Sequence, residues 1–258
     1  MLFSRASLLF ALSTVVAAAP YEKRWFGGWG QGSNSDVLES FLDFGKRHSW
    51  RGRTTTQGQC NVAAVQMPQA PKPLPPPSEG LTLYHVAVGR GTQNYTCDLS
   101  NSTAIPIAAG AVASLFNVTC MSADSPTLLS AIPNIALELP TPTATDATSP
   151  INRDISGHHY FTDLTTAFFN LDTTLSTYGA GGFKKTNSSD APSTAVKGQH
   201  GQGYGSVPWL KLQAKTKDEC VFQEVYRINT AGGNPPKTCQ GQQAAFQIEY
   251  SAEYWFYS

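Results

Sequence analysis

The sequence predicts an all-β fold, a single β-sandwich or barrel-like domain with long loops and one short N-terminal helix. The clearest observation is the last strand, where apolar residues occupy every second position from Phe246 to Phe256 and polar residues lie between them. Other short strand-like runs are separated by glycine, proline and asparagine clusters. The sequence shows no alternation of strands and helices, so a parallel sheet is disfavoured. This pattern is typical of a sandwich or barrel.

The N-terminus has the features of a secretory signal peptide over residues 1–19. Arg5 precedes a short apolar run that ends in small residues before Pro20. No later segment reaches the roughly 18 apolar residues that a membrane helix needs. We therefore expect a secreted, extracellular, soluble protein without membrane insertion. Lys23-Arg24 and Lys46-Arg47 fit a dibasic processing protease, and uncut surface pairs are an equal alternative.

Three regions follow the signal peptide. Residues 20–59 are expected to form a mobile arm with a candidate propeptide, because the Trp25–Gly30 segment is too rich in glycine for a packed element. Within this arm, Asp36–Phe44 has helical spacing and a capping box. Residues 60–80 read as a proline-rich linker. The all-β domain is assigned to residues 81–258.

The domain divides into strands at its turn signals. We expect a turn or bulge at residues 89–91, a helical turn with an extended end over 126–139, and a long loop or lid over 178–205. The expected strands are 81–88, 92–99, 111–120, 158–162, 167–171, 207–214, 221–229 and 246–257.

Charge excludes one class of partner. Lys+Arg 18 balances Asp+Glu 18, so no basic surplus exists for binding nucleic acid. An extracellular carbohydrate or cell-wall component is the partner that we consider instead. The sequence leaves the oligomeric state open.

The cysteines lie far apart with no C-x-x-C pair, which favours disulfides. We predict Cys97–Cys120, because the two expected strands are sequential. Cys60–Cys239 is the preferred second pair, which leaves Cys220 free, although five cysteines allow about fifteen arrangements. Asn-x-Ser/Thr sequons add predicted glycosylation sites. These are Asn94, Asn101, Asn117 and Asn187.

Five separated blocks of sequence carry a resemblance. They are Gly89–Cys97, Gly157–Phe161, Pro208–Leu210, Val225–Gly233 and Tyr250–Tyr257. Together, from about Gln59 onward, the chain resembles a family of secreted fungal proteins classed as a domain of unknown function, whose members are often named malate dehydrogenase in sequence records. The resemblance implies no catalytic residues.

The residues do not support the dehydrogenase name. Nucleotide binding in such enzymes needs G-x-G-x-x-G between a strand and a helix, and no such string occurs. We therefore expect no cofactor. The G-x-S-x-G motif of serine hydrolases and the H-E-x-x-H motif of metalloproteases are also missing from the sequence. Glu224 and Glu249 are the one candidate acid–base pair, if the strand register allows it, and solvated strand-face carboxylates are the preferred interpretation.

A polar group on the predicted strands is the candidate binding site. His158 and His159 point to opposite faces of one strand, and with no second ligand at short spacing we predict no metal. A core polar network is preferred over the floor of a ligand pocket. The candidate binding residues are Gln93, Tyr95, His158, His159, Tyr160, Trp209, Arg227 and Asn229.

Arg227 separates these alternatives. As a structural residue it requires converging partners, and Arg227→Ala should then cost roughly 3 kcal/mol or more. As a ligand-holding residue its loss should spare folding, and the structural role is the preferred one. The functional prediction is a secreted glycoprotein with no assigned activity, most simply a binding or cell-surface interaction protein with a candidate carbohydrate ligand. The alternative is an extracellular polysaccharide hydrolase or lyase.

Overall fold

The structure is a computed structural model that describes residues 60–142, 154–174, 176–216 and 220–258. The predicted signal peptide, the arm over residues 20–59 and its Asp36–Phe44 helix lie outside the described residues. All described residues belong to one compact unit, Ser33–Ser258.

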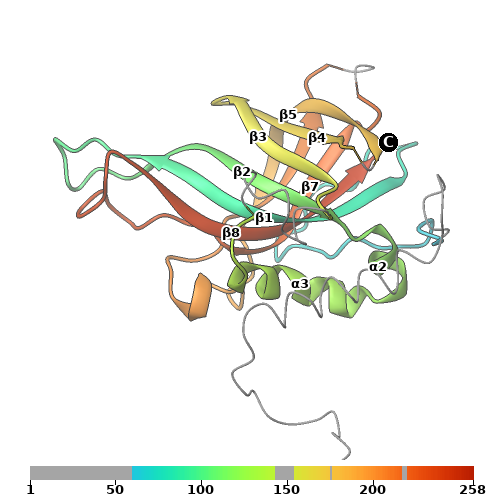
Figure 1. The fold of residues 1–258 in the computed structure, drawn as a ribbon, viewed down its shortest axis with the longest axis horizontal. Coiled ribbons are helices and arrows are strands. Elements are labelled where there is room, and N and C mark those ends of the chain that lie inside the picture. Colours follow the sequence, from blue (N-terminus) through green and yellow to red (C-terminus); the bar gives the residue numbers. More distant parts are fainter. Residues whose placement is uncertain (1–59, 143–153, 175, 217–219) are drawn as a thin grey trace, which may run out of the picture. The chain divides into compact units, whose positions relative to one another are not determined.

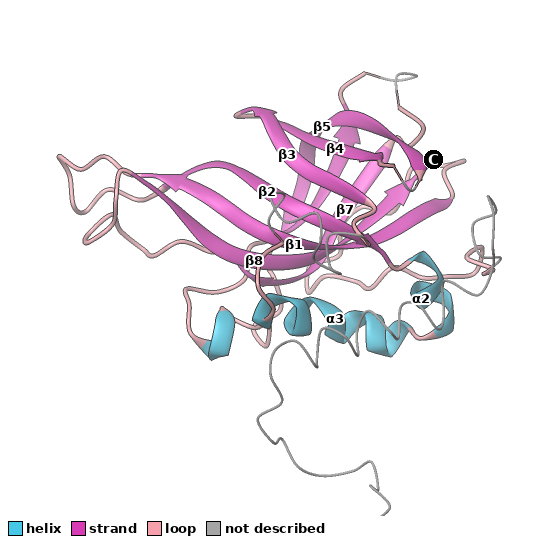
Figure 2. Ribbon diagram, in the orientation of Figure 1, coloured by secondary structure: helices cyan, strands magenta, loops and turns pink. Residues whose placement is uncertain are grey.

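The described residues form a closed barrel of eight antiparallel strands, each paired with its neighbour in the chain (Figures 1 and 2). The predicted all-β class is thereby confirmed as a barrel. Pairing of the first strand with the last closes it, so each of the eight strands has a hydrogen-bonded neighbour on both sides. The strands are β1 Leu83–Thr96, β2 Ile107–Asn117, β3 Gly157–Asp163, β4 Thr166–Asp172, β5 Thr177–Ser189, β6 Trp209–Ala214, β7 Glu224–Gly232 and β8 Ala245–Tyr257.

β1 runs without a break through Gly89–Gly91, so the predicted turn or bulge there is wrong. The glycines serve close packing instead. A Cβ on Gly91 would lie 1.9 Å from the Val112 carbonyl oxygen of β2, and one on Gly89 would lie 2.6 Å from the Tyr254 ring. Only glycine fits these two positions of a continuous strand.

The barrel interior holds an apolar core to which seven of the eight strands contribute buried residues. Phe222, from the connection before β7, stacks on Phe183 with ring centroids 5.3 Å apart and packs edge-on against Phe256. It has no exposed surface. Aromatic rings thus fill the end of the barrel at which β7 begins.

A second apolar layer lies outside the barrel. Helices α2 (Thr119–Asp124) and α3 (Pro126–Glu138) run along the face made by β1, β7 and β8 (Figure 2). Leu129 and Ile132 of α3 join Trp255 in this outer core. The extended end predicted within residues 126–139 is wrong, because α3 continues to Glu138 with Pro133 inside it. Pro126 occupies the helix start, where proline is tolerated.

The proline-rich segment packs on the same outer layer. Ala70 and Leu74 are buried there. The carbonyl of Pro75 accepts a hydrogen bond from the Tyr226 hydroxyl at 2.8 Å, and that of Pro76 accepts one from Lys211 Nζ at 2.7 Å. The segment therefore contributes contacts to the barrel wall.

Residues 177–189 form strand β5, where a continuous loop or lid over 178–205 was expected. Glycine is unusual in strands, and here it makes room for a neighbour. A Cβ on Gly181 would lie 2.7 Å from the Cys220 sulfur. The remaining 190–205 connection contains the short helix η1, Gln199–Gly201.

The structure pairs Cys60 with Cys120 and Cys97 with Cys239, and Cys220 is free and buried. The predicted pairing is wrong, although the four bonded cysteines and the free one are those expected. Because β1 is continuous and antiparallel to β2, Cys97 and Cys120 lie near opposite ends of that hairpin. Cys239 instead lies beside the hairpin end, where its N–H donates to the Ala104 carbonyl.

Among the described residues, no helix is long and apolar enough to cross a membrane.

The aromatic packing at Phe222 predicts a large stability effect. Phe222→Ala should reduce the free energy of unfolding by about 3–5 kcal/mol, since a buried ring leaves a cavity. Val221→Ala is the matched control, because Val221 is 55% exposed and its loss should cost less than about 0.5 kcal/mol. Urea unfolding of both variants checks this. Equal losses would contradict the role of Phe222.

Candidate functional site

Polar side chains from four strands gather inside the barrel. We call this group the interior polar cluster, and its residues are buried among the apolar core. Its members are Gln93 and Tyr95 of β1, His159 of β3, Arg227 of β7, and Tyr250 and Tyr254 of β8.

Strand alternation places each of these side chains. Tyr250 and Tyr254 lie four residues apart on the inner face of β8, with the small Ala252 between them, so their hydroxyls meet at 2.8 Å. Arg227 is the register partner of Tyr254 on β7. Closure of the barrel brings Gln93 beside Tyr250 through the β1–β8 pairing.

The cluster lies toward the end of the barrel at which β1 and β7 finish. The Tyr95 hydroxyl donates to the carbonyl of Gly233 at 2.8 Å, directly after β7. A Cβ on Gly233 would lie 2.9 Å from Tyr250, 3.0 Å from Val207 and 3.1 Å from Gln93. The backbone around Gly233 therefore forms the wall beside the cluster.

Two donors in this cluster have no partner. Arg227 Nη2 donates to the Pro208 carbonyl at 2.9 Å, but its Nε makes no hydrogen bond. The amide nitrogen of Gln93 lies beside the Tyr250 hydroxyl but makes no hydrogen bond of good geometry. Each residue is 8% exposed, so the interior does not close fully around them. Unpaired buried donors cost free energy unless another molecule supplies an acceptor.

The guanidinium is the one formal charge of the cluster at neutral pH. Burial, opposed by the hydrogen bond to the Phe168 carbonyl and assisted by nearby Arg227, lowers the pKa of His159 to about 4. Burial raises the pKa of Tyr95 to about 12 and raises those of Tyr250 and Tyr254. No described carboxylate forms an ion pair with Arg227.

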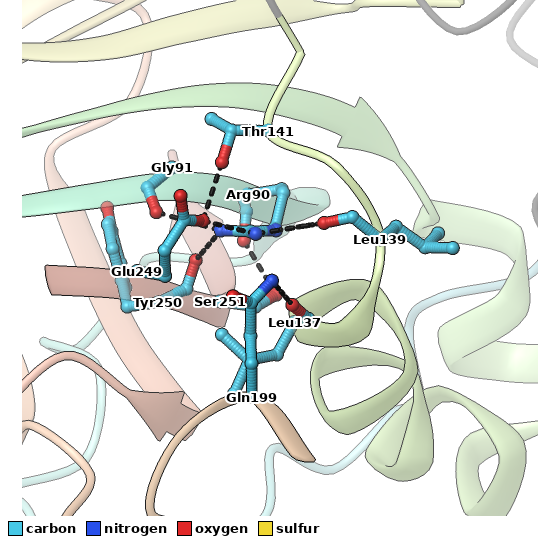
Figure 3. Close-up of polar contacts among 10 residues, drawn as sticks. Arg90, Gly91, Leu137, Leu139, Thr141, Gln199, Glu249, Tyr250 and Ser251 are labelled. Carbon is cyan, nitrogen blue, oxygen red and sulfur yellow. Dashed lines mark hydrogen bonds and ion pairs between the residues drawn. The ribbon is translucent and has the colours of Figure 1, made fainter. Parts of the chain in front are cut away.

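A second buried arginine on the outer face shows the contrast (Figure 3). Arg90 donates from Nε and Nη2 to the carbonyl of Leu139, at the end of α3, at 3.1 and 2.9 Å. Its Nη1 donates to the Gly91 and Tyr250 carbonyls, and Glu249 forms an ion pair with it. Arg90 thus fastens the end of α3 to β1 and β8, whereas Arg227 has no such set of partners.

The predicted binding residues divide between the two faces of the barrel wall. Gln93, Tyr95, His159 and Arg227 face the interior. Tyr160 and Trp209 lie on the outer face, where Trp209 belongs to the outer core. Asn229, also outside, donates to Glu253 at 2.7 Å. His158 is exposed, so the expectation that the two histidines face opposite ways is met.

The proposed acid–base pair of Glu224 and Glu249 is ruled out by register. Glu224 pairs with Tyr257 on β8, eight residues from Glu249, which is roughly 26 Å at about 3.3 Å per residue. Each carboxylate has its own cation, Lys211 for Glu224 and Arg90 for Glu249. Neither is placed to share a substrate with the other.

Two residues of the cluster were not predicted as site residues. Tyr250 and Tyr254 were recognised as inward-facing core residues, and the signal that could have found them is a pair of hydroxyl-bearing rings four positions apart on one strand face. Glu253, one of the polar residues that alternate along the last strand, is fully buried on the outer face, where it accepts hydrogen bonds from Asn229 and Trp255.

The predicted glycosylation sites differ in accessibility. Asn101 and Asn187 are exposed, and Asn94 is half-buried on β1. The side chain of Asn117 is engaged: its oxygen accepts from the Thr119 N–H and hydroxyl, and its nitrogen lies 3.4 Å from the Tyr178 hydroxyl.

Over the described part of the chain, no group of three His, Cys, Asp or Glu side chains is arranged to hold a metal ion.

The two buried arginines should respond differently to substitution. Arg90→Met should destabilise the protein by about 3 kcal/mol, because three carbonyls and Glu249 lose their donor. Arg227→Met should change stability by less than about 1 kcal/mol, since it removes one hydrogen bond together with a poorly compensated buried charge. Denaturant unfolding measures both. A loss of about 3 kcal/mol for Arg227→Met would support the structural role instead.

Burial of His159 predicts a dependence of stability on pH. Its pKa is about 6.5 in the unfolded chain and about 4 in the folded one. The unfolded state therefore binds the proton first, and stability should fall as pH drops from about 6.5 to 4, by up to about 1.4 kcal/mol per pH unit. His85, whose burial lowers its pKa to about 3, acts in the same direction.

His159→Phe should remove the contribution of one titrating group, about one proton, from the slope of the unfolding free energy against pH. His158→Phe, at the exposed neighbouring position, should leave this slope unchanged. Urea midpoints between pH 4 and 7 test the pair. If both variants retain the wild-type slope, His159 is not a buried neutral residue.

Comparison with known proteins adds a family but no activity. No curated protein and no solved structure shows significant similarity to the chain. One family model, described as a protein of unknown function (DUF3455), matches residues 77–258. The match covers the whole barrel, and the chain belongs to this family of proteins of unknown function.

Proposed function

We propose that the protein is a secreted binding protein that takes a small molecule into the barrel interior, beside the interior polar cluster. The observation that carries the proposal is the pair of unpaired buried donors, Arg227 Nε and Gln93 Nε2. Both belong to one cluster, and a bound molecule with acceptor atoms would satisfy both.

The surroundings support a site of this kind. The Tyr95 hydroxyl and the tyrosine pair of β8 already have partners, so these rings are held in place. His159 stacks on Phe169 with centroids 4.3 Å apart. Small inward-facing residues, Ala111 and Ala113, lie opposite them on β2. A few fixed polar groups in an apolar wall are what small-molecule sites present.

A carbohydrate platform on the outer surface has less support. Such a platform needs a row of exposed flat rings. Among the large hydrophobic residues exposed in the described chain, the aromatic one is Tyr204, at 56%. We therefore place the binding role inside the barrel. The hydrolase or lyase alternative loses its one candidate carboxylate pair, and no other observation favours it.

Secretion is supported by independent features. Near its start the sequence has Arg5, an apolar run and small residues in the order of a signal peptide. Two disulfides require an oxidising compartment to persist. The exposed sequons at Asn101 and Asn187 fit the same route.

A matched pair of variants on β2 tests the interior site. Ala111 is the register partner of Gln93 and faces the interior, and its neighbour Val112 is 52% exposed on the outside. A thermal-shift screen of a small-molecule library on the wild-type protein should give stabilising compounds. Ala111→Phe should abolish their effect by filling the site, and Val112→Phe should preserve it.

Two results would contradict the proposal: a library without any stabilising compound, or compounds that stabilise Ala111→Phe as well as wild type. If Ala111→Phe does not fold, Ala111→Leu provides a smaller obstruction at the same position.

A further inference from the structure

We propose that the group recognised by the interior polar cluster is a carboxylate, carried on a small molecule with an apolar body. This inference rests on the proposed function and assigns the ligand its chemical class. It begins with how the protein treats its other cations.

Three other cationic side chains of the described chain each lie against a carboxylate. Arg90 has Glu249, and Lys211 has Glu224 at 3.0 Å. Lys215, more exposed, has Asp163 at 3.7 Å. Arg227 is as buried as Lys211, but its partners are neutral: it donates to the Pro208 carbonyl and its guanidinium interacts with the Tyr254 hydroxyl. An ionised group in such surroundings is stabilised by a counter-charge, and within the described residues none lies against it.

The hydrogen-bonding capacity of the cluster points to the same conclusion. Both unpaired groups, Arg227 Nε and the Gln93 amide nitrogen, are donors. The guanidinium has no accepting atom, and an ionised carboxylate accepts without donating. One carboxylate has two oxygens and one negative charge, which match two donors and one positive charge. A phosphate would bring a larger charge than the single guanidinium balances.

The side chains around the cluster indicate the polarity that the rest of the ligand should have. Beside His159, which is neutral at physiological pH, lie Phe161 and Phe169 at ring distances of 5.6 and 4.3 Å. The inner face of β2 adds alanines rather than polar residues. These walls offer apolar contacts and few hydrogen bonds, so a polyhydroxy body such as that of a sugar acid would leave its hydroxyls unpaired.

Benzoate is the probe, and benzamide, of the same shape without the charge, is its control. Isothermal titration on the full secreted protein should show benzoate binding that is at least about tenfold tighter than benzamide. Arg227→Met should weaken benzoate by about tenfold or more. Lys184→Met removes the same charge from an exposed position of β5 and should keep the wild-type affinity. If Arg227→Met fails to fold, Arg227→Lys and Gln93→Leu replace it, and each should weaken benzoate.

Each of the remaining outcomes would contradict one part of the proposal. Equal affinity for benzamide and benzoate, both lost in Ala111→Phe, would retain the interior site and overturn the carboxylate. Tighter binding of phenyl phosphate would replace carboxylate by phosphate, and tighter binding of glucuronate would overturn the apolar body. Absence of benzoate binding up to about 10 mM would overturn the carboxylate proposal. The library screen with Ala111→Phe then decides whether the interior site itself stands.

Discussion

The pairing of β8 with both β1 and β7 is the constraint on which the rest of the structure depends. It closes the barrel and fixes which residues of three strands face inward. The inner face of β8 then carries Tyr250 and Tyr254, and its outer face carries Glu253 and Trp255 beneath α3. A register shift of one residue would exchange these two sets. The interior polar cluster and the docking of the helices are therefore both set by one pair of strand registers.

The two faces use polar residues in different ways. On the outer face, two buried polar groups are satisfied by the chain itself: Glu253 by Asn229 and Trp255, and Arg90 by the end of α3. Such groups add specificity to how the outer layer packs. On the inner face, Arg227 Nε and Gln93 Nε2 are left without a hydrogen bond of good geometry inside a largely apolar core. The buried Nε1 of Trp209 on the outer face also lacks a partner, so what sets the inner pair apart is that one of its donors belongs to a buried charge. Unsatisfied groups of this kind occur at functional sites.

The sequence was sufficient for the fold class and for much of the barrel, because period-two alternation survives wherever one face is buried. The last strand, the all-β class and the opposite directions of His158 and His159 followed from that rule. The prediction was wrong where local composition indicated a turn that the structure does not have. Glycines at Gly89 and Gly91 suggested a turn, yet they serve close packing across a continuous strand. The disulfide pairing failed for a different reason: it assumed that sequential strands bring their cysteines together, whereas Cys97 and Cys120 lie near opposite ends of the antiparallel β1–β2 hairpin.

The site could be predicted only in part, because sequence periodicity gives the face of a residue but not its partners. Arg90 and Arg227 both lie on buried strand positions, and nothing local distinguishes them. Their difference arises from elements distant in sequence: α3 ends at Arg90, and Glu249 reaches it from β8, whereas Arg227 meets tyrosines and a single carbonyl. Because a buried charge is stable only through such long-range partners, the functional meaning of an arginine emerges after closure of the barrel. The residue whose partners the chain does not supply is then the one available to a ligand.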